Sequence, residues 1–216
     1  PMEEPFREVP TAIEAEDPNA VDFVDRVNRF VATIFGLKKE AESLLNKAEA
    51  LAGEPGSDQW FLYQINRGER MRTEGSVAEA AEVFQEILVH LGDEPSINKA
   101  NMLGRLGRCY GAGGRPDWAE KEYRVALEIL DKLEEDEQIK RQRGAFLTDL
   151  ADVLVARGRF QEAREAYEEG LRIDEDLDDL RSQGVTHGQL GTLAMLEGNL
   201  KEAGDRWEKA LSLFQK

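Results

Sequence analysis

Cysteine and histidine are scarce in this sequence of 216 residues, which has one cysteine and two histidines. The single Cys109 excludes an internal disulfide framework and a cysteine-based zinc site. His90 and His187 show none of the close His-x-x-His spacings of metal sites, so structural roles are predicted for both. Cys109 is predicted to be a buried, inert thiol; the alternative is a thiol made reactive by a neighbouring arginine. No metal or cofactor is expected.

Long apolar runs and an excess of positive charge are also missing. The apolar runs are far shorter than the roughly 20 residues that span a bilayer, and no secretory leader is expected. Lys and Arg number 28 against 44 Asp and Glu, a net charge of −16, which argues against binding a nucleic acid because phosphates require clustered basic residues. We therefore expect a cytoplasmic protein with no nucleic-acid or membrane partner.

Motifs for catalysis are weak. The glycine-rich segment 111–115 lacks the Gly-Lys-Ser/Thr ending of a phosphate-binding loop, so it predicts a turn between helices. The acidic strings 133–138 and 174–179 lack the spacing of a calcium-binding loop and are predicted to be solvated helix ends. Trp60 has the least determined place among the aromatic residues, and stacking on a ligand stays an alternative for it. These features predict a protein that is not an enzyme.

Five segments repeat the same spacing of small and large residues. A small residue is followed four positions later by a large apolar one and, three further on, usually by another small one. This spacing places all three on one face of a closely packed helix. The triples are Ala41/Leu45/Ala48, Ala80/Phe84/Ile87, Ala119/Tyr123/Ala126, Ala163/Tyr167/Gly170 and Ala203/Trp207/Ala210.

A second helix is expected before each of the last four triples. The stretches 66–71, 105–110, 149–154 and 189–194 recur at the same period of about 40 residues. Glycines separate these stretches from the triples, and the glycines are Gly75, Gly113–Gly114, Gly158 and Gly198. Each unit is therefore predicted to be a helix A, a tight turn and a helix B.

These units resemble tetratricopeptide repeats, most clearly at Leu103, Leu106, Gly107, Tyr110, Ala119, Tyr123 and Ala126. The resemblance implies an all-α, right-handed superhelical solenoid of antiparallel helix hairpins. Repeats longer than the usual 34 residues are similar to those of kinesin light chain and of bacterial sensor domains. The predicted divisions are an N-terminal extended segment at 1–16, a degenerate first repeat or capping hairpin at 17–56, and four repeats at approximately 57–95, 96–137, 138–179 and 180–216.

In this family, helix A residues beside the packing positions line a concave groove that binds a peptide or protein segment. Superposing the repeats predicts nine partner-binding residues, which are Asn66, Glu69, Arg72, Arg105, Arg108, Asp149, Asp152, Gln189 and Thr192. In the long-repeat families an asparagine of this kind grips the partner's backbone, and only Asn66 keeps it.

The charges in these rows permit two interpretations. Arg105 and Arg108 could form the basic half of a docking strip and Asp149 and Asp152 its acidic half. Arg141, Arg143 and Arg181 would then widen the basic side. Alternatively, neighbouring rows pair with each other as exposed salt bridges, each contributing roughly 0–1 kcal/mol.

The last helix ends without a polar capping helix, which a solenoid needs at its termini. Leu211, Leu213 and Phe214 therefore predict either a continuing chain or self-association, with a tolerated exposed edge as the alternative.

Together these features predict a non-enzymatic protein-interaction module, part of a larger bacterial signalling protein as sensor or scaffold. Three alternatives stay open. They are a co-chaperone-like adaptor that clamps a terminal carboxylate, a regulatory phosphatase with tetratricopeptide repeats, and an oligomerising structural protein. The phosphatases carry a catalytic glutamine in an N-terminal helical bundle, and the predicted first helix here has none.

Overall fold

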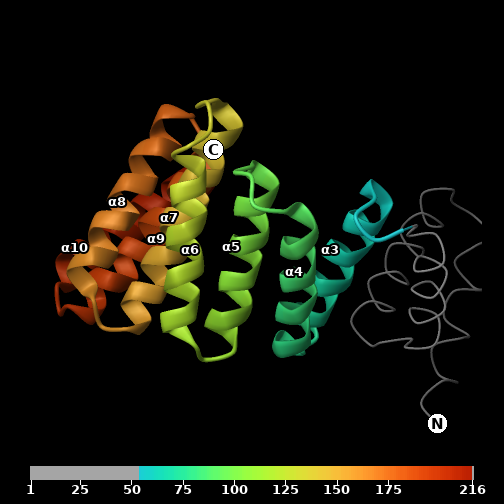
Figure 1. Cartoon of the computed structure of the whole chain (residues 1–216). Helices are drawn as coiled ribbons and strands as arrows, with labels where there is room; N and C mark the ends of the chain where they lie inside the picture. The colour runs from blue at the N-terminus through green and yellow to red at the C-terminus, as the bar shows by residue number, and fades with distance from the viewer. Residues whose placement is uncertain (1–53, 216) are drawn as a thin grey trace, which may run out of the picture. The chain divides into compact units, whose positions relative to one another are not determined.

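The computed structural model describes residues 54–215, which lie in a compact unit comprising Glu54–Lys216. The predictions for 1–16 and for the repeat at 17–56 therefore lie, apart from the last three residues, outside the described part. Within 54–215 every regular element is a helix, and the helices form four antiparallel hairpins (Figure 1). The all-α solenoid predicted from the repeats is confirmed.

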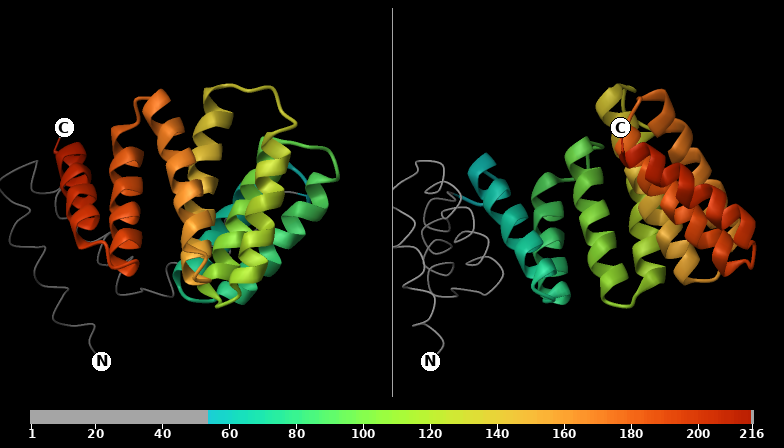
Figure 2. Two further views of the ribbon diagram at one scale, coloured as in Figure 1. Left: turned by 90° about the vertical axis from the view of Figure 1, so that its left-hand side faces the viewer. Right: turned by 180° about the vertical axis from the view of Figure 1, so that it is seen from behind.

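The hairpins follow one another along the array (Figure 2). Each has a helix A followed by a helix B. The pairs are α3 (Asp58–Thr73) with α4 (Val77–Leu91), α5 (Ile97–Ala112) with α6 (Pro116–Leu130), α7 (Glu137–Ala156) with α8 (Phe160–Asp176), and α9 (Leu180–Leu196) with α10 (Leu200–Phe214).

Glycine turns and polar caps set the ends of these helices. The backbone φ angles of Gly75, Gly114, Gly158 and Gly198 lie between 70° and 90°, a conformation that glycine adopts without strain. Each joins helix A to helix B of one hairpin, as predicted. The side chains of Ser57, Ser96, Asp136 and Asp179 accept backbone hydrogen bonds at the starts of α3, α5, α7 and α9.

Small residues let large ones lie between the helices. The first alanine of each of the last four triples is fully buried. The aromatic side chain four residues later on helix B lies against helix A of the same hairpin. A Cβ on Gly107 would lie 2.9 Å from the Tyr123 ring, and one on Gly68 would lie 2.7 Å from the Phe84 ring. Between hairpins, Phe146 of α7 is in contact with the backbone of α5 at Gly104. The core is therefore continuous along the array.

The structure corrects the prediction of a solvated helix end at 174–179 for one residue, Asp174, whereas Glu175, Asp176 and Asp178 are exposed as predicted. Asp174 is buried at the junction of α8 with α9, although it occupies the position that Leu130 holds one repeat earlier. Its backbone carbonyl accepts a hydrogen bond from Gln183, and Thr186 donates a 3.4 Å hydrogen bond to its carboxylate. Burial, with the charge of Asp179 adding to it, raises the pKa of Asp174 to about 6.

Candidate protein-binding surface

The nine residues predicted to bind a partner lie on the four A helices, α3, α5, α7 and α9, and we call them the A-helix strip. Successive A helices also contact one another directly, α5 with α7 and α7 with α9. The strip therefore crosses the junctions between all four hairpins.

Charged groups of the strip form ion pairs with each other. Glu69 bonds to Arg72 on its own helix, at 2.9 Å, and to Arg105 on α5. Arg108 of α5 bonds to Asp149 of α7 at 2.9 Å. These pairs match the alternative in which neighbouring rows pair internally, and the strip does not divide into one basic and one acidic half. Between a quarter and two fifths of each of these side chains stays exposed, so the groups are still accessible to a partner.

Asp152 differs from the other charged residues of the strip. Tyr167 of α8 and Gln189 of α9 both donate hydrogen bonds to its Oδ1, the latter at 3.0 Å. Within residues 54–215, no hydrogen-bond donor reaches its Oδ2 and no cationic side chain pairs with it. The residue is also exposed, so it presents a carboxylate oxygen that has no partner in the described chain.

Burial and charge shift the pKa values of the strip carboxylates in different directions. Desolvation raises the pKa of Asp149, and the bonded Arg108 opposes this without cancelling it. Desolvation also raises the pKa of Asp152, and the charge of Asp149 adds to the rise while the hydrogen bonds from Tyr167 and Gln189 oppose it. Desolvation would also raise the pKa of Glu69, but the bonded Arg72 and Arg105 together outweigh the desolvation, so the pKa of Glu69 is lowered.

Asn66 and Thr192 form their side-chain hydrogen bonds within their own helices, as far as residues 54–215 are concerned. The Asn66 amide donates to the Leu62 carbonyl at 2.8 Å, and the Thr192 hydroxyl donates to the Gly188 carbonyl at 3.1 Å. Both residues are exposed on the strip. Asn66 is therefore placed where a partner could replace its local hydrogen bond.

Two other expectations about this surface are corrected. Arg141 pairs with Glu137 and Asp179, and Arg143 pairs with Asp131 at 2.6 Å, so neither adds a free positive charge to the strip. Trp60 is buried and makes edge contacts with the rings of Phe61 and His90, which leaves no face for a ligand. A structural role therefore replaces the ligand-stacking alternative for Trp60.

The last hairpin exposes apolar residues that earlier hairpins bury. Trp207 is 41% exposed, whereas its counterparts Phe84, Tyr123 and Tyr167 are at most 2% exposed. Leu211 and Phe214 are 58% and 55% exposed. Leu213, which was predicted to share this surface, is buried instead. Trp207 was predicted to be repeat core, and it is exposed because its outer side has no following helix A in the described chain.

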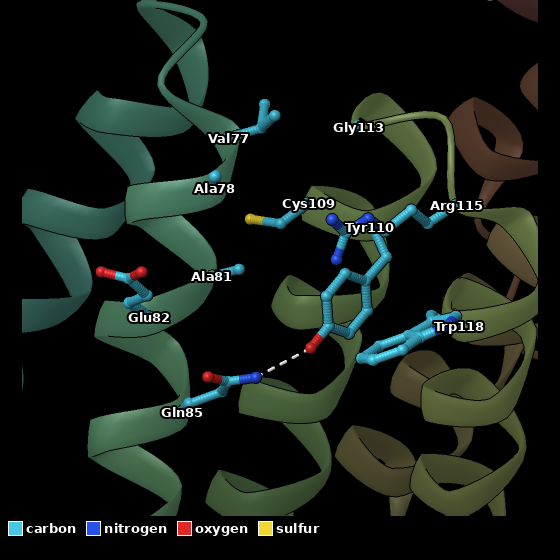
Figure 3. Close-up of a pocket in the computed structure, with 10 residues that line it drawn as sticks. All are labelled: Val77, Ala78, Ala81, Glu82, Gln85, Cys109, Tyr110, Gly113, Arg115 and Trp118. Atoms are coloured by element: carbon cyan, nitrogen blue, oxygen red, sulfur yellow. Dashed lines mark hydrogen bonds between the residues drawn. The ribbon is translucent and has the colours of Figure 1, made fainter.

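A cavity of about 350 Å³ lies between α4, α5 and α6, and no residue of the strip lines it (Figure 3). Tyr110 and Trp118 meet there edge to face with their ring centres 5.3 Å apart, and Gln85 donates a 2.8 Å hydrogen bond to the Tyr110 hydroxyl. Trp118 lies in the first turn of α6 and was not among the predicted binding residues. Comparing the repeats position by position would have marked it, because Glu162 and Glu202 hold its place in the next two hairpins.

Cys109 forms part of the cavity lining and is buried, as predicted. Burial raises the pKa of its thiol to about 11, so the thiol is protonated and unreactive at neutral pH. Within residues 54–215, no three His, Cys, Asp or Glu side chains are grouped so that they could hold a metal ion. No helix in this part of the chain is long and apolar enough to cross a membrane.

Comparison with known proteins supports the repeat assignment. Residues 144–177 match the family model of the tetratricopeptide repeat. No curated protein sequence matches the chain. The fold and this match confirm the resemblance: residues 144–177 match a tetratricopeptide repeat, and the described chain has the fold of a tetratricopeptide repeat solenoid.

Several solved structures share the fold. BtubC (BKLC) from P. vanneervenii has a TM-score of 0.67 at 20% identity, over 82% of this chain and 72% of that one. The nearly identical TPR-like repeats of a candidate kinesin light chain from Podosopora anserina give 0.65 at 21% identity, over 84% and 89%. The Cut9–Hcn1 hetero-tetramer of the APC/C gives 0.62 at 17% identity, over 84% and 31%. At these identities the likeness establishes the fold alone.

Proposed function

We propose that this chain is a non-enzymatic scaffold that binds a segment of another protein along the A-helix strip. Tetratricopeptide repeat folds are generally protein–protein interaction scaffolds, and the similar Cut9–Hcn1 structure is an assembly of different chains. The observation that carries the proposal is Asp152. It is an exposed carboxylate with one oxygen that has no partner among residues 54–215, in a strip whose other charged residues already have partners of opposite charge.

The chemistry of Asp152 indicates what the partner presents. A lysine or arginine of a bound segment would supply the donors that Oδ2 lacks, in a charge-assisted hydrogen bond. The same cation would oppose the desolvation that raises the pKa of Asp152. Asn66, at the other end of the strip, would bond to the partner's backbone. We infer that the partner is an extended segment with a basic residue.

Replacing Asp152 by asparagine should weaken the partner's binding by about tenfold or more, because a charge-assisted hydrogen bond is worth about 1.5–3 kcal/mol. The partner would be captured from native lysate by the wild-type chain and identified by mass spectrometry. Its affinity for the purified variants would then be measured by calorimetric titration. Raising the salt concentration should weaken binding to the wild type more than to Asp152→Asn.

An exposed carboxylate outside the strip provides the matched control. Asp176→Asn makes the same change on α8, where the side chain is exposed. It should bind the partner as tightly as the wild type if Asp152 is the group that contacts the partner. Equal affinity of wild type and Asp152→Asn would contradict the proposal and would direct attention to other faces of the array.

We propose that this chain is the sensor or scaffold part of a larger signalling protein in the bacterial cytoplasm. Its long repeats support this proposal.

The carboxylate-clamp alternative needs free cations on the strip, and Arg105 and Arg108 are already paired with Glu69 and Asp149. The phosphatase alternative is tested by incubating the chain with a phosphorylated receiver domain. Faster loss of phosphate than in the receiver alone would support catalysis.

A second proposed function is self-association through the outer face of α10. Leu200, Gly204, Trp207, Leu211 and Phe214 form a stripe on that face, and the positions of Trp207 and Leu211 are covered by the next hairpin in the earlier repeats. Gly204 has open space above it, although a glycine inside a helix costs about 1 kcal/mol relative to alanine. In an antiparallel pair of α10 helices from two copies, Gly204 can face Trp207, Leu200 can face Leu211, and Asp205 can face Arg206.

Replacing Leu211 by glutamate should keep the chain monomeric, whereas the wild type should form dimers as its concentration rises. Leu211 is 58% exposed, so the change should alter the free energy of unfolding little while it places a charge in the apolar stripe. Light scattering over a concentration series measures the mass directly. Val89→Glu on α4, where the side chain is 79% exposed, is the matched control and should associate like the wild type. A wild type that stays monomeric at every concentration rules out this second function.

A further inference from the structure

The cavity between α4, α5 and α6 lies at a kind of junction that occurs three times in the array. At each junction two successive B helices lie on either side of the A helix between them. The other two junctions join α6, α7 and α8, and α8, α9 and α10. Residues at the same repeat position can therefore be compared across the three.

Ion-pair clusters occupy the other two junctions. Between α6 and α8, the buried Glu120 accepts hydrogen bonds from Arg124, Arg157 and Arg159. Between α8 and α10, Arg164 bonds to Glu197 at 2.5 Å and to Glu202 at 2.6 Å. In both, long charged side chains from the B helices and from the turn of the next hairpin meet and occupy the space.

The junction between α4, α5 and α6 has small residues at the positions where the other two junctions have charged residues. Ala81 holds the position of Glu120 and Arg164, and Gly113 holds that of Arg157 and Glu197. Trp118 takes the place of Glu162 and lies at one side, 55% exposed. The cavity thus lies where the following repeats have two longer side chains, and Figure 3 shows Ala81 and Gly113 on its walls.

Arg115 keeps its charge in this junction but has lost its carboxylate partners. Its counterpart Arg159 pairs with Glu120 at 2.8 Å and with Glu162. Within residues 54–215 no carboxylate lies within ion-pair distance of Arg115, whose guanidinium is 5.6 Å from the centre of the Trp118 ring. Figure 3 shows Arg115 reaching over the cavity, with Glu82 on the opposite side.

We propose that this cavity binds a small carboxylate with an aromatic body. The carboxylate would pair with Arg115, as Glu120 pairs with Arg159 in the next junction. The ring would lie against Tyr110 and Trp118, over a floor formed by Ala78, Ala81 and Cys109. A volume of about 350 Å³ suits a single-ring compound and lies at the small end of the range of ligand pockets.

Arg115 sets which way such a ligand would lie, because it attracts the carboxylate to the side of the α5–α6 turn. Glu82 lines the cavity on the α4 side. Gln85 is held by its hydrogen bond to the Tyr110 hydroxyl, so the edge of that ring is already in place. No residue of the A-helix strip lines the cavity, so this inference does not rest on the proposed function.

The test is a titration of the full chain with phenylacetate, followed by two-dimensional NMR of amide and indole N–H groups. Phenylacetate at millimolar concentrations should shift the Trp118 indole resonance, assigned with Trp118→Phe, and amides within 77–85 and 109–118. Phenylacetamide has the same ring without the charge, and it should bind about tenfold more weakly because it cannot form the charge-assisted bond. The absence of localised shifts with phenylacetate overturns the proposal.

Two variants test separately whether binding needs the open cavity and whether it needs the charge of Arg115. Ala81→Glu supplies the carboxylate that the junction lacks, so it should occupy the cavity, pair with Arg115 and abolish the binding of both compounds. Arg115→Gln should weaken phenylacetate about tenfold and leave phenylacetamide unchanged. The control Arg172→Gln, at an exposed arginine on α8, should bind both like the wild type. Equal binding of phenylacetate to Arg115→Gln and wild type would refute the assigned role of Arg115, even if Ala81→Glu failed to fold.

Discussion

Replacing Phe146 by alanine should lower the free energy of unfolding by about 3–5 kcal/mol. The side chain is 1% exposed and touches the backbone of α5 at Gly104, where no Cβ would fit. Its ring centre is 6.3 Å from that of Tyr123 on α6. The substitution therefore opens a cavity where the second and third hairpins meet, and this contact couples the two halves of the array.

The measurement is urea unfolding followed by far-ultraviolet circular dichroism. Because neighbouring repeats stabilise one another, we also expect the transition of Phe146→Ala to broaden or to divide into two. Val89→Ala removes an apolar side chain that is 79% exposed, and it should change the free energy of unfolding by less than about 0.5 kcal/mol. A loss of less than about 1 kcal/mol in Phe146→Ala would show that the inter-hairpin contact is not a principal source of stability.

Replacing Asp174 by asparagine should stabilise the chain at neutral pH by about 2–3 kcal/mol. The folded-state pKa of about 6 lies above the value of about 3.9 in an unfolded chain, so the folded state binds the proton more tightly. The contribution of Asp174 to the free energy of unfolding of the wild type is therefore fully present below about pH 4. This contribution is lost as the pH rises toward and through 6. Asparagine stays neutral and removes this loss.

Measuring urea unfolding of both proteins from acidic to neutral pH tests this directly. The difference in stability between Asp174→Asn and wild type should be small at the acidic end and should grow in favour of the variant as the pH rises. Asp178→Asn, four residues further on at an exposed position, removes one carboxylate in the same way and is the matched control. The same pH slope in wild type and Asp174→Asn would mean that the buried carboxylate is not the titrating group.

Most of the architecture could be predicted because it depends on local spacing. The recurring glycines predicted the tight turns, and the triples predicted which helical faces are buried. Both patterns are properties of one hairpin, and they hold wherever the hairpin stands in the array. The nine strip residues were likewise found on the A helices, because superposing repeats transfers a position from one helix to the next.

What lies between hairpins was harder to predict. From their charges alone, Arg108 and Asp149 could belong to a basic and an acidic half of the strip or could form an ion pair with each other. They form an ion pair because α5 and α7 lie close together. Two charged groups on different helices can be paired or apart at the same sequence spacing. The distance between their helices therefore determined what the strip offers to a partner.

By itself the sequence determined an all-α tetratricopeptide repeat solenoid, with its turns, its buried helix faces and the helices that carry the strip. Only the tertiary structure decided which members of a repeated position are exposed. Tyr167 and Trp207 share one motif, yet Tyr167 is 2% exposed and Trp207 is 41% exposed. Asp174 is buried at a repeat position that Leu130 occupies one repeat earlier, where an apolar residue would be expected. The reason is that burial of a helix B depends on the hairpin that follows it, so the same local pattern has different surroundings along the chain.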